Sequence, residues 1–283
     1  MASVDTSNKG QPTGPAAHFA AAHAQDHPLK LYGAWFCPFV QRSWIVLAEK
    51  NIPHQYIEIN PYHKSSEFLA LNPRGLVPTL AVPVAGEDQK DKLKPLYEST
   101  VICEYLDEAF TEESKYGPRL LPEDVYERAR ARLWIDHVNS RIVPSFYRFI
   151  QHTPDKGYSI GDVRREFLGH LKVFVEEMGD GGPWFLGVRF GLVDVMLAPW
   201  AKRLFLIDYY KAGGVGIPGV GEGGEDEAVW SRWRVWKDAI FERESVRGTW
   251  SEDGKYVDVY RRYAEDTAQS EVGKATREGK SLP

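Results

Sequence analysis

The pattern of apolar and polar positions over residues 28–112 alternates between two periodicities. Short apolar or alternating runs predict four strands, at 29–33, 54–59, 79–82 and 93–97. Apolar residues at helical spacing predict helices at 38–50, 65–71 and 99–110. A polar turn at 86–92 separates the last two strands. The order β-α-β-α-β-β-α predicts one compact α/β domain.

After Tyr116-Gly117-Pro118 the pattern becomes helical throughout. A long helical stretch covers 123–150, and Pro144 is expected to kink it. Further helices are predicted at about 160–178, 192–210, 226–242 and 255–266. Residues 119–270 are therefore expected to form an all-α domain.

Three segments lie outside these patterns. Residues 213–224 hold seven glycines and no Gly-Lys-Ser/Thr ending, which favours a flexible interhelical loop over a phosphate cradle. Residues 1–27 are rich in small and polar residues, without the apolar core of a secretion signal and without arginine. We expect this segment, and residues 271–283 at the other end, to be flexible tails.

Composition excludes several kinds of partner. The net charge of −5 argues against nucleic-acid binding, and no apolar run approaches the roughly 20 residues that cross a bilayer, so no membrane partner is expected. The chain has only two cysteines, Cys37 and Cys103, which favours a reducing, cytoplasmic location. Two thiols so far apart do not form a zinc site of the Cys-x-x-Cys kind, and no metal is expected.

The cluster Trp35-Phe36-Cys37-Pro38-Phe39 places a thiol where a strand passes into a helix. Unpaired N–H groups and the helix dipole at that point stabilise a thiolate. A cysteine in such a place can have a pKa of roughly 3.5–7.5 and act as a nucleophile at neutral pH. A buried cysteine that serves as a small apolar side chain is the other interpretation, and this motif alone leaves both open.

Two further motifs follow along the chain. Val77-Pro78 lies in a segment like the one in which thioredoxin-like proteins keep a cis proline beside the reactive thiol. Glu98-Ser99 stands at the start of a predicted helix. A helix N-terminus with a serine is suited to a carboxylate, and a glutamate there to an ammonium group. The γ-glutamyl end of glutathione carries both groups.

With Cys-Pro-Phe, Val-Pro and Glu-Ser in this order, the chain resembles cytosolic glutathione transferases over residues 29–264. Within them it is similar to the omega class, which has a cysteine where other classes have tyrosine or serine. The resemblance implies the glutathione transferase fold: a thioredoxin-like, glutathione-binding N-terminal domain and a helical, substrate-binding C-terminal domain. It also implies a homodimer and assigns glutathione contacts to Phe39, Lys64, Val77, Pro78, Glu98 and Ser99.

The helical half carries weaker signals. Gly191-Leu192-Val193-Asp194 occupies the place of the family's capping box, but glycine replaces the capping hydroxyl, so only Asp194 can accept a backbone hydrogen bond. By the resemblance, Arg203 and Trp236 would line the substrate pocket. Trp35, close to Cys37 in the sequence, is expected there too because it adds to the aromatic side chains Phe39 and Trp236 around the thiol. So many large side chains beside one thiol favour a flat aromatic acceptor or a disulfide, although plain packing explains them as well.

A cysteine at this position predicts glutathione-dependent thiol transfer: deglutathionylation, or reduction of disulfides or dehydroascorbate. Position 40 is valine, so no second cysteine completes Cys-x-x-Cys and the mechanism is expected to be monothiol. Cys103 stands among apolar positions of the predicted helix at 99–110 and is expected in the core.

Three alternatives stay open. The first is a conventional conjugating transferase, which position 37 disfavours. The second is a glutathionyl-hydroquinone reductase, although that family has Cys-Pro-Trp where this chain has Phe39. The third is a non-enzymatic ligand carrier or a relative of the chloride intracellular channel proteins, which share Cys-Pro-Phe.

Overall fold

The computed structural model describes residues 10–84 and 92–283. The predicted turn at 86–92 falls almost wholly on the gap and lies outside the described residues. The chain divides into two compact units. Of the described residues, one unit, called the sheet unit here, comprises 10–84, 92–120 and 244–255; the other, the helical unit, comprises 121–243 and 256–283.

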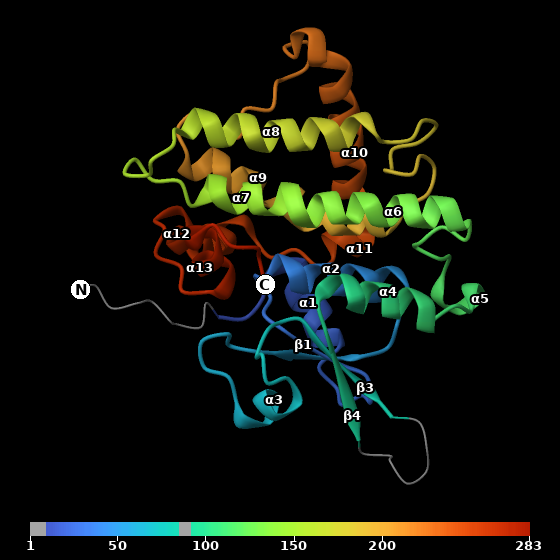
Figure 1. Cartoon of the computed structure of the whole chain (residues 1–283). Coiled ribbons are helices and arrows are strands. Elements are labelled where there is room, and N and C mark those ends of the chain that lie inside the picture. Colours follow the sequence, from blue (N-terminus) through green and yellow to red (C-terminus); the bar gives the residue numbers. More distant parts are fainter. Residues whose placement is uncertain (1–9, 85–91) are drawn as a thin grey trace. The chain divides into compact units, whose positions relative to one another are not determined.

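A four-stranded mixed sheet organises the sheet unit (Figure 1). Its strands are β1 (Lys30–Gly33), β2 (Gln55–Glu58), β3 (Thr79–Pro83) and β4 (Leu93–Tyr97), in the order β2-β1-β3-β4. β1 runs parallel to β2 and antiparallel to β3, and β4 is antiparallel to β3. The parallel pair is joined through a helix, as a crossover requires. This confirms the predicted thioredoxin-like fold and all four predicted strands.

The sheet unit also contains helices. They are α1 (Gly14–Ala22), α2 (Pro38–Glu49), α3 (Ser66–Leu71), α4 (Ser99–Ala109), α5 (Glu113–Tyr116) and α11 (Glu244–Arg247). α2 and α4 pack side by side on one face, and α3 lies on the other (Figure 1). Pro38 occupies the first position of α2, where its missing N–H costs nothing. Nine of the twelve residues of α2 are buried, so this helix lies at the centre of the core.

The N-terminal segment is not a flexible tail over its described residues, and that prediction was wrong. α1 occupies part of it, and Ala16 is fully buried. The Ala16 amide donates to the Trp250 carbonyl at 2.9 Å, and the Thr13 hydroxyl accepts from the Glu252 amide at 3.1 Å. Small alanines gave little amphipathic signal, because they pack closely without forming a wide apolar stripe.

The helical unit contains α6 (Val125–His137), a π-helical turn (Val138–Ile142), α7 (Val143–Ile150), α8 (Ile160–Glu176), α9 (Leu192–Tyr210), a 3-10 turn (Gly224–Asp226), α10 (Glu227–Glu242), α12 (Asp253–Ala264) and α13 (Glu271–Glu278). Its described residues contain one extended pairing, the isolated bridge between Trp184 and Gly187. The predicted all-helical character is thus confirmed. The interruption expected at Pro144 takes the form of the π-helical turn just before it, where the helical hydrogen-bond ladder changes pitch.

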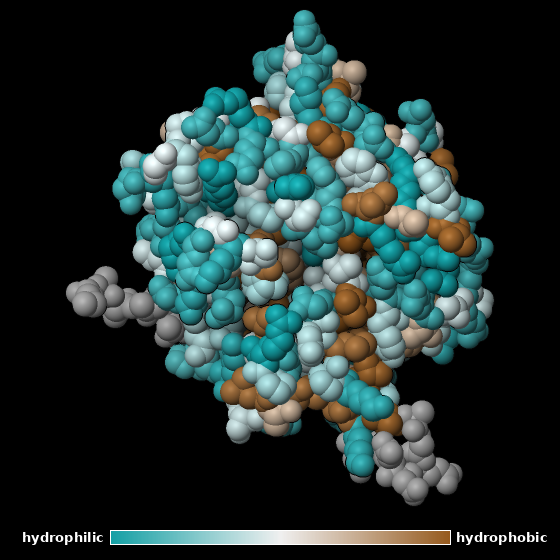
Figure 2. All heavy atoms as spheres, viewed as in Figure 1, coloured by the Kyte–Doolittle hydropathy of each residue, from teal (hydrophilic) through white to brown (hydrophobic). Residues whose placement is uncertain are grey.

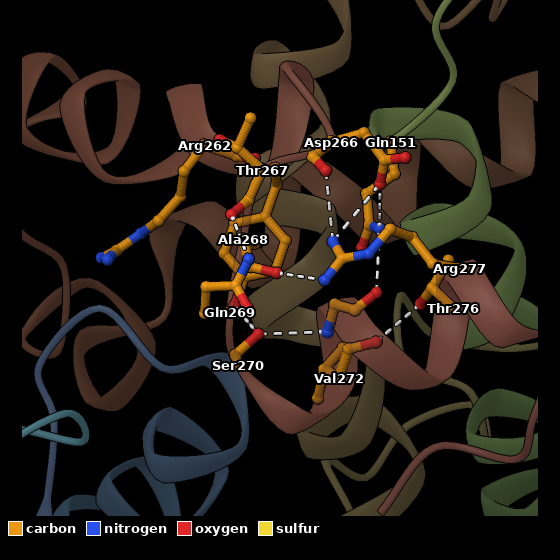
Figure 3. Close-up of polar contacts among 12 residues, drawn as sticks. Gln151, Arg262, Asp266, Thr267, Ala268, Gln269, Ser270, Val272, Thr276 and Arg277 are labelled. Carbon is orange, nitrogen blue, oxygen red and sulfur yellow. Dashed lines mark hydrogen bonds and ion pairs between the residues drawn. The ribbon is translucent and has the colours of Figure 1, made fainter. Parts of the chain in front are cut away.

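The C-terminal segment 271–283 was also expected to be flexible, and this too was wrong: α13 docks in a polar network (Figure 3). The guanidinium of Arg277 donates to the carbonyls of Asp266, at 3.2 Å, and Ala268, at 2.7 Å. The amide of Gln151 donates to the Asp266 carboxylate, at 2.9 Å, and to the Gly273 carbonyl, at 3.2 Å. The contacts are polar, so hydrophobic periodicity could not reveal them.

We expect Arg277→Ala to loosen α13, because two backbone carbonyls lose their donor. The free energy of unfolding should fall by about 1–2 kcal/mol, and amide hydrogen exchange over 271–278 should accelerate. Lys274→Ala is the matched control, since this exposed side chain pairs with Glu271 one turn away, at 3.7 Å, and donates to no backbone carbonyl that holds α13 among the described contacts. Equal exchange rates in both variants would contradict a docking role for Arg277.

The glycine-rich segment 213–224 joins α9 to the 3-10 turn as an irregular loop, in agreement with the interhelical prediction. The Arg164 guanidinium donates to the carbonyls of Ala212, at 2.6 Å, and Gly214, at 3.1 Å. Asp208 accepts from the Val215 amide at 2.8 Å. The first part of the loop is therefore fixed by side chains of α8 and α9.

No helix among residues 10–84 and 92–283 is long and apolar enough to cross a membrane. The face of the molecule in Figure 2 is mostly hydrophilic, with scattered apolar patches.

Candidate active site

Cys37 is the N-cap residue of α2, directly before Pro38. Its amide donates to the Ala34 carbonyl at 2.9 Å, which closes a turn between β1 and α2. Its side chain is partly exposed, and Sγ lies 3.9 Å from the Val77 carbonyl oxygen. The structure therefore puts the thiol at the positive end of a helix, where a thiolate is stabilised.

The Val77–Pro78 peptide bond is cis. Asn72, fully buried, organises the loop before it: its side-chain amide donates to the Leu76 carbonyl, at 3.2 Å, and to the Thr79 hydroxyl, at 2.9 Å. The Val77 carbonyl is thereby held beside the Cys37 thiol. Sequence reasoning found the proline and missed Asn72, whose only sequence signal is its place in an Asn-Pro turn.

Glu98 and Ser99 lie where β4 passes into α4, the helix whose N-cap residue is Glu98. Glu98 has φ 69°, a backbone conformation uncommon outside glycine, which turns this residue sharply out of the strand. Its carboxylate is half exposed and pairs with the Arg74 guanidinium at 2.5 Å. Ser99 is buried, and its hydroxyl accepts from Arg42 at 3.2 Å. The Glu98 carboxylate and the Ser99 hydroxyl, which were predicted to bind the γ-glutamyl end, are thus adjacent. Each contacts an arginine, Arg74 and Arg42 respectively, and sequence reasoning missed both arginines.

Lys64 and Phe39 contact other parts of the same unit. A Cβ placed on Gly75 would lie 3.0 Å from the Lys64 ammonium nitrogen, so the lysine side chain lies along the Gly75 backbone, two residues before Val77. The guanidinium carbon of Arg42 lies 5.4 Å from the centre of the Phe39 ring, within cation–π range. The six residues predicted to contact glutathione all belong to the sheet unit.

Glu58 and Tyr56 lie beneath the turn that carries Cys37, and sequence reasoning missed both. One carboxylate oxygen of Glu58 accepts from the Trp35 amide at 3.1 Å, and the other accepts from the Tyr56 hydroxyl. Burial raises the pKa of Glu58 to about 7, although the two hydrogen bonds lower it in part. An acid that titrates near neutral pH therefore contacts the backbone two residues before the thiol.

The residues predicted to line an acceptor pocket are packed within their own units. Trp35 is 1% exposed, and its indole N–H donates to the Gly10 carbonyl at 3.0 Å. Arg203 is fully buried; it donates to the Pro199 carbonyl at 2.7 Å, and its guanidinium lies 4.6 Å from the centre of the Tyr256 ring. These contacts give both side chains structural partners, and their contact with a substrate stays a prediction.

Trp236 is fully buried in the helical unit, and its indole N–H donates to the Asp194 carboxylate at 2.7 Å. Asp194 also accepts from the amides of Phe185, at 2.8 Å, and Gly191, at 2.9 Å. The bond from Gly191 confirms the half capping box predicted for Asp194. Burial raises the pKa of Asp194 to about 6 despite these three hydrogen bonds. Trp236 thus belongs to a buried polar centre, a placement that favours packing over substrate contact.

Cys103 is fully buried in α4, and burial raises the pKa of its thiol to about 12. It is therefore a thiol and not a thiolate at neutral pH, as its apolar neighbours in the sequence indicated. Of the two cysteines, only Cys37 has the exposure and the helix-terminal position that a nucleophile needs.

A thioredoxin-like unit with a cysteine at the helix start, a cis proline beside it and an acidic helix cap, followed by a helical unit, defines the class of glutathione transferases. The family models agree. That of the glutathione S-transferase N-terminal domain matches residues 36–109, and that of the C-terminal domain matches residues 123–239. The chain belongs to the glutathione S-transferase family.

Individual relatives point to the omega class. Pig glutathione S-transferase omega-1 is 35% identical over 62% of this chain and 67% of its own length. Pyrimidodiazepine synthase of Drosophila melanogaster is 32% identical over 65% of this chain and 68% of its own length. The crystal structure of glutathione transferase Omega 3C from Trametes versicolor superposes with a TM-score of 0.75 and 39% identity, over 92% of this chain and all of that one. The resemblance to omega-class transferases is thus confirmed.

Proposed function

We propose that this glutathione transferase is an omega-like thiol transferase in which Cys37 is the nucleophile. The observation that carries the proposal is the place of Cys37: N-cap of α2, with Sγ 3.9 Å from the carbonyl before a cis proline. A hydroxyl at this point would donate a hydrogen bond to a glutathione thiolate and favour conjugation. A thiolate exchanges disulfides instead.

The proposed cycle has two exchanges. The Cys37 thiolate attacks the glutathione sulfur of a mixed disulfide, and the acceptor leaves as its thiolate, which takes a proton from water. A glutathione thiolate then attacks the glutathione sulfur of the Cys37 mixed disulfide, which releases oxidised glutathione and restores the Cys37 thiolate. No second cysteine takes part, since Cys103 is buried and its pKa is raised to about 12.

Mass spectrometry tests the intermediate directly. After incubation with oxidised glutathione, the wild-type protein should carry one glutathione on Cys37, removable by excess reduced glutathione. Cys103→Ser should be labelled equally, because this buried thiol takes no part. Labelling at Cys103, or no labelling of either cysteine, would overturn the monothiol cycle.

Glutathione itself is proposed to lie along the sheet unit. Its γ-glutamyl end would meet Glu98 and Ser99, its cysteinyl backbone Val77 and Pro78, and its glycyl carboxylate Lys64, with Phe39 nearby. The hydroxyl of Ser99 and the half-exposed carboxylate of Glu98 supply the groups that this end of the peptide needs.

We expect Ser99→Ala to weaken glutathione binding by about 0.5–2 kcal/mol, because one hydrogen bond to a carboxylate is lost. Glu98→Ala should cost at least as much, since it removes the partner of the ammonium group. Titration calorimetry measures both. Ser159→Ala, which removes the N-cap hydroxyl of α8 in the other unit, is the matched control and should bind normally. Unchanged affinity in both site variants would place the ligand elsewhere.

The acceptor is proposed to be a disulfide or an aromatic glutathione conjugate. Reduction of glutathionyl-hydroquinones is the second candidate, and it is separated from the first by comparing turnover of such a conjugate with that of hydroxyethyl disulfide. The homodimer is likewise a proposal, tested by light scattering of the purified protein. The predicted cytoplasmic location stays a prediction.

A further inference from the structure

The turn that carries Cys37 is hydrogen-bonded to a carboxylate. Glu58 ends β2 and is partly buried. Its side chain accepts from the Trp35 amide at 3.1 Å, and the Cys37 amide closes the same turn on the Ala34 carbonyl at 2.9 Å. A backbone N–H bonded to a carboxylate is held more firmly than one bonded to a neutral acceptor. Glu58 therefore fixes the chain two residues before the thiol.

Tyr56 completes this arrangement from the same face of β2. Its hydroxyl donates to the second oxygen of Glu58. Its ring is buried and lies against Gly33, where an added Cβ would be 3.1 Å from the ring. The centre of the same ring lies 4.5 Å from the centre of the Trp44 ring. Burial raises the Tyr56 pKa first, and the charges of Glu58 and Cys37 raise it further. The phenol therefore lies within electrostatic reach of both the carboxyl group and the thiol.

Other titratable groups near β1, β2 and α2 include two histidines. Burial lowers the pKa of His54, which directly precedes β2, to about 3, and it also lowers that of His23, which follows α1 and stacks on His54. Both rings are neutral at pH 7. On α2 the Arg42 guanidinium faces away, toward Ser99 and Cys103. At the far end of β1, Lys30 bonds Gln55 and pairs with Asp26.

We propose that Glu58 is a positioning residue for Cys37, which holds the turn through the Trp35 amide and, by gaining or losing its own charge, sets how readily Cys37 becomes a thiolate. The inference rests on the proposed role of Cys37 and adds a regulator to that site. It concerns the substrate-free protein and needs no ligand.

The sign follows from Coulomb's law. An ionised Glu58 disfavours a second negative charge on Cys37, whereas a protonated Glu58 does not. Because burial raises the pKa of Glu58 to about 7, this change in charge falls near neutral pH. Two acids coupled in this way titrate as a pair, so the thiolate of Cys37 forms over a broader pH range than a lone thiol would give.

Glu58→Gln separates charge from geometry. Glutamine keeps an oxygen for the Trp35 amide and can donate to the Tyr56 oxygen, but it carries no charge at any pH. Below about pH 6 the variant should match the wild type, since Glu58 is then protonated. Around pH 7 its Cys37 should react roughly 2–10-fold faster, the effect of removing one nearby charge, and the difference should shrink toward pH 9, where the thiol is ionised in both proteins.

Alkylation by iodoacetamide measures this without glutathione. Cys37 attacks the iodine-bearing carbon, iodide leaves, and the thiol proton passes to water. Rates are followed from pH 5 to 9 by mass spectrometry of the Cys37 peptide, with Cys103 as an internal unreactive thiol. A purely structural Glu58 would change the rate by one factor at every pH, or not at all. Either result would overturn the proposal.

Tyr56→Phe is a second variant, which tests the same coupling if Glu58→Gln folds poorly. It removes the hydroxyl that stabilises the Glu58 carboxylate, so the pKa of Glu58 should rise and the enhanced reactivity should extend to higher pH. An unmoved profile would count against the coupling. Failure of the proposed function is a separate outcome: thiol transfer would then survive Cys37→Ser while the alkylation profiles still depended on Glu58.

Discussion

Replacing Cys37 with serine will lower glutathione-dependent reduction of hydroxyethyl disulfide by at least ~10³-fold, the scale expected when a covalent nucleophile is removed. A serine hydroxyl stays protonated at neutral pH, and its oxygen does not displace a thiolate from a disulfide, so the covalent intermediate cannot form. The fold should survive, because Cys37 is an N-cap residue without a side-chain capping bond, and serine is favoured at such positions.

The same variant should gain conjugating activity toward an aromatic electrophile such as 1-chloro-2,4-dinitrobenzene. A hydroxyl at position 37 can donate a hydrogen bond to the glutathione thiolate, which is the role of tyrosine or serine in other classes of the family. Cys103→Ser is the matched control and should retain thiol transfer. Undiminished disulfide reduction by Cys37→Ser would remove Cys37 from the mechanism, whatever its position.

The sheet unit could be predicted from the sequence because its elements follow the two simple periodicities. The predicted helix at 38–50 and the observed α2, Pro38–Glu49, differ by one residue, since Pro38 marks the start and Asn51 and Pro53 the end. Cys37, Pro78 and Ser99 stand out because their chemistry depends on local position: before a proline, in a cis bond, at a helix start. Each signal lies within a few residues of the chain.

The supporting residues could not be predicted, because their roles depend on contacts between distant segments. In the sequence, Glu58 looks like an ordinary polar residue of a strand, and only its hydrogen bond to the Trp35 amide in the structure shows its role. Arg42 reads as a surface residue of α2, yet it is buried against Ser99. α1 and α13 were missed for the same reason. The α1 segment is held through hydrogen bonds to Trp250 and Glu252, and α13 is held through the Asp266 network, so neither needs a wide apolar stripe.

Asp194 should be the most costly polar residue to remove from the helical unit. It accepts three hydrogen bonds, from the amides of Phe185 and Gly191 and the indole of Trp236, and all lie in the core. Asp194→Ala leaves these three buried donors without an acceptor, because water does not reach them. We therefore expect the free energy of unfolding to fall by about 3–5 kcal/mol. Urea unfolding followed by circular dichroism measures the loss.

A matched control exists on α8, where Asp162 is also the third residue of a helix and accepts from the backbone amide of its N-cap residue, Ser159. Asp162 is exposed, so water replaces the lost acceptor and Asp162→Ala should cost much less. Losses of similar size in the two variants would show that Asp194 acts only as a helix cap and that its buried donors find other partners.

The pH dependence separates the two carboxylates further. Burial raises the pKa of Asp194 from 3.8 to about 6, so the folded chain holds this proton more tightly than the unfolded chain does. The stability that depends on Asp194 is therefore full below about pH 4, declines as the pH rises to about 6 and is constant above. The difference in unfolding free energy between the wild type and Asp194→Ala should accordingly be larger at pH 4 than at pH 8. Hydrogen bonds from Ser159 lower the pKa of Asp162, so its contribution to stability has the opposite pH dependence and is lost as the pH falls.

A wild-type advantage over Asp194→Ala that grew with pH would contradict this expectation. It would mean that the three donors hold Asp194 as a carboxylate, and that hydrogen bonding outweighs burial at this site.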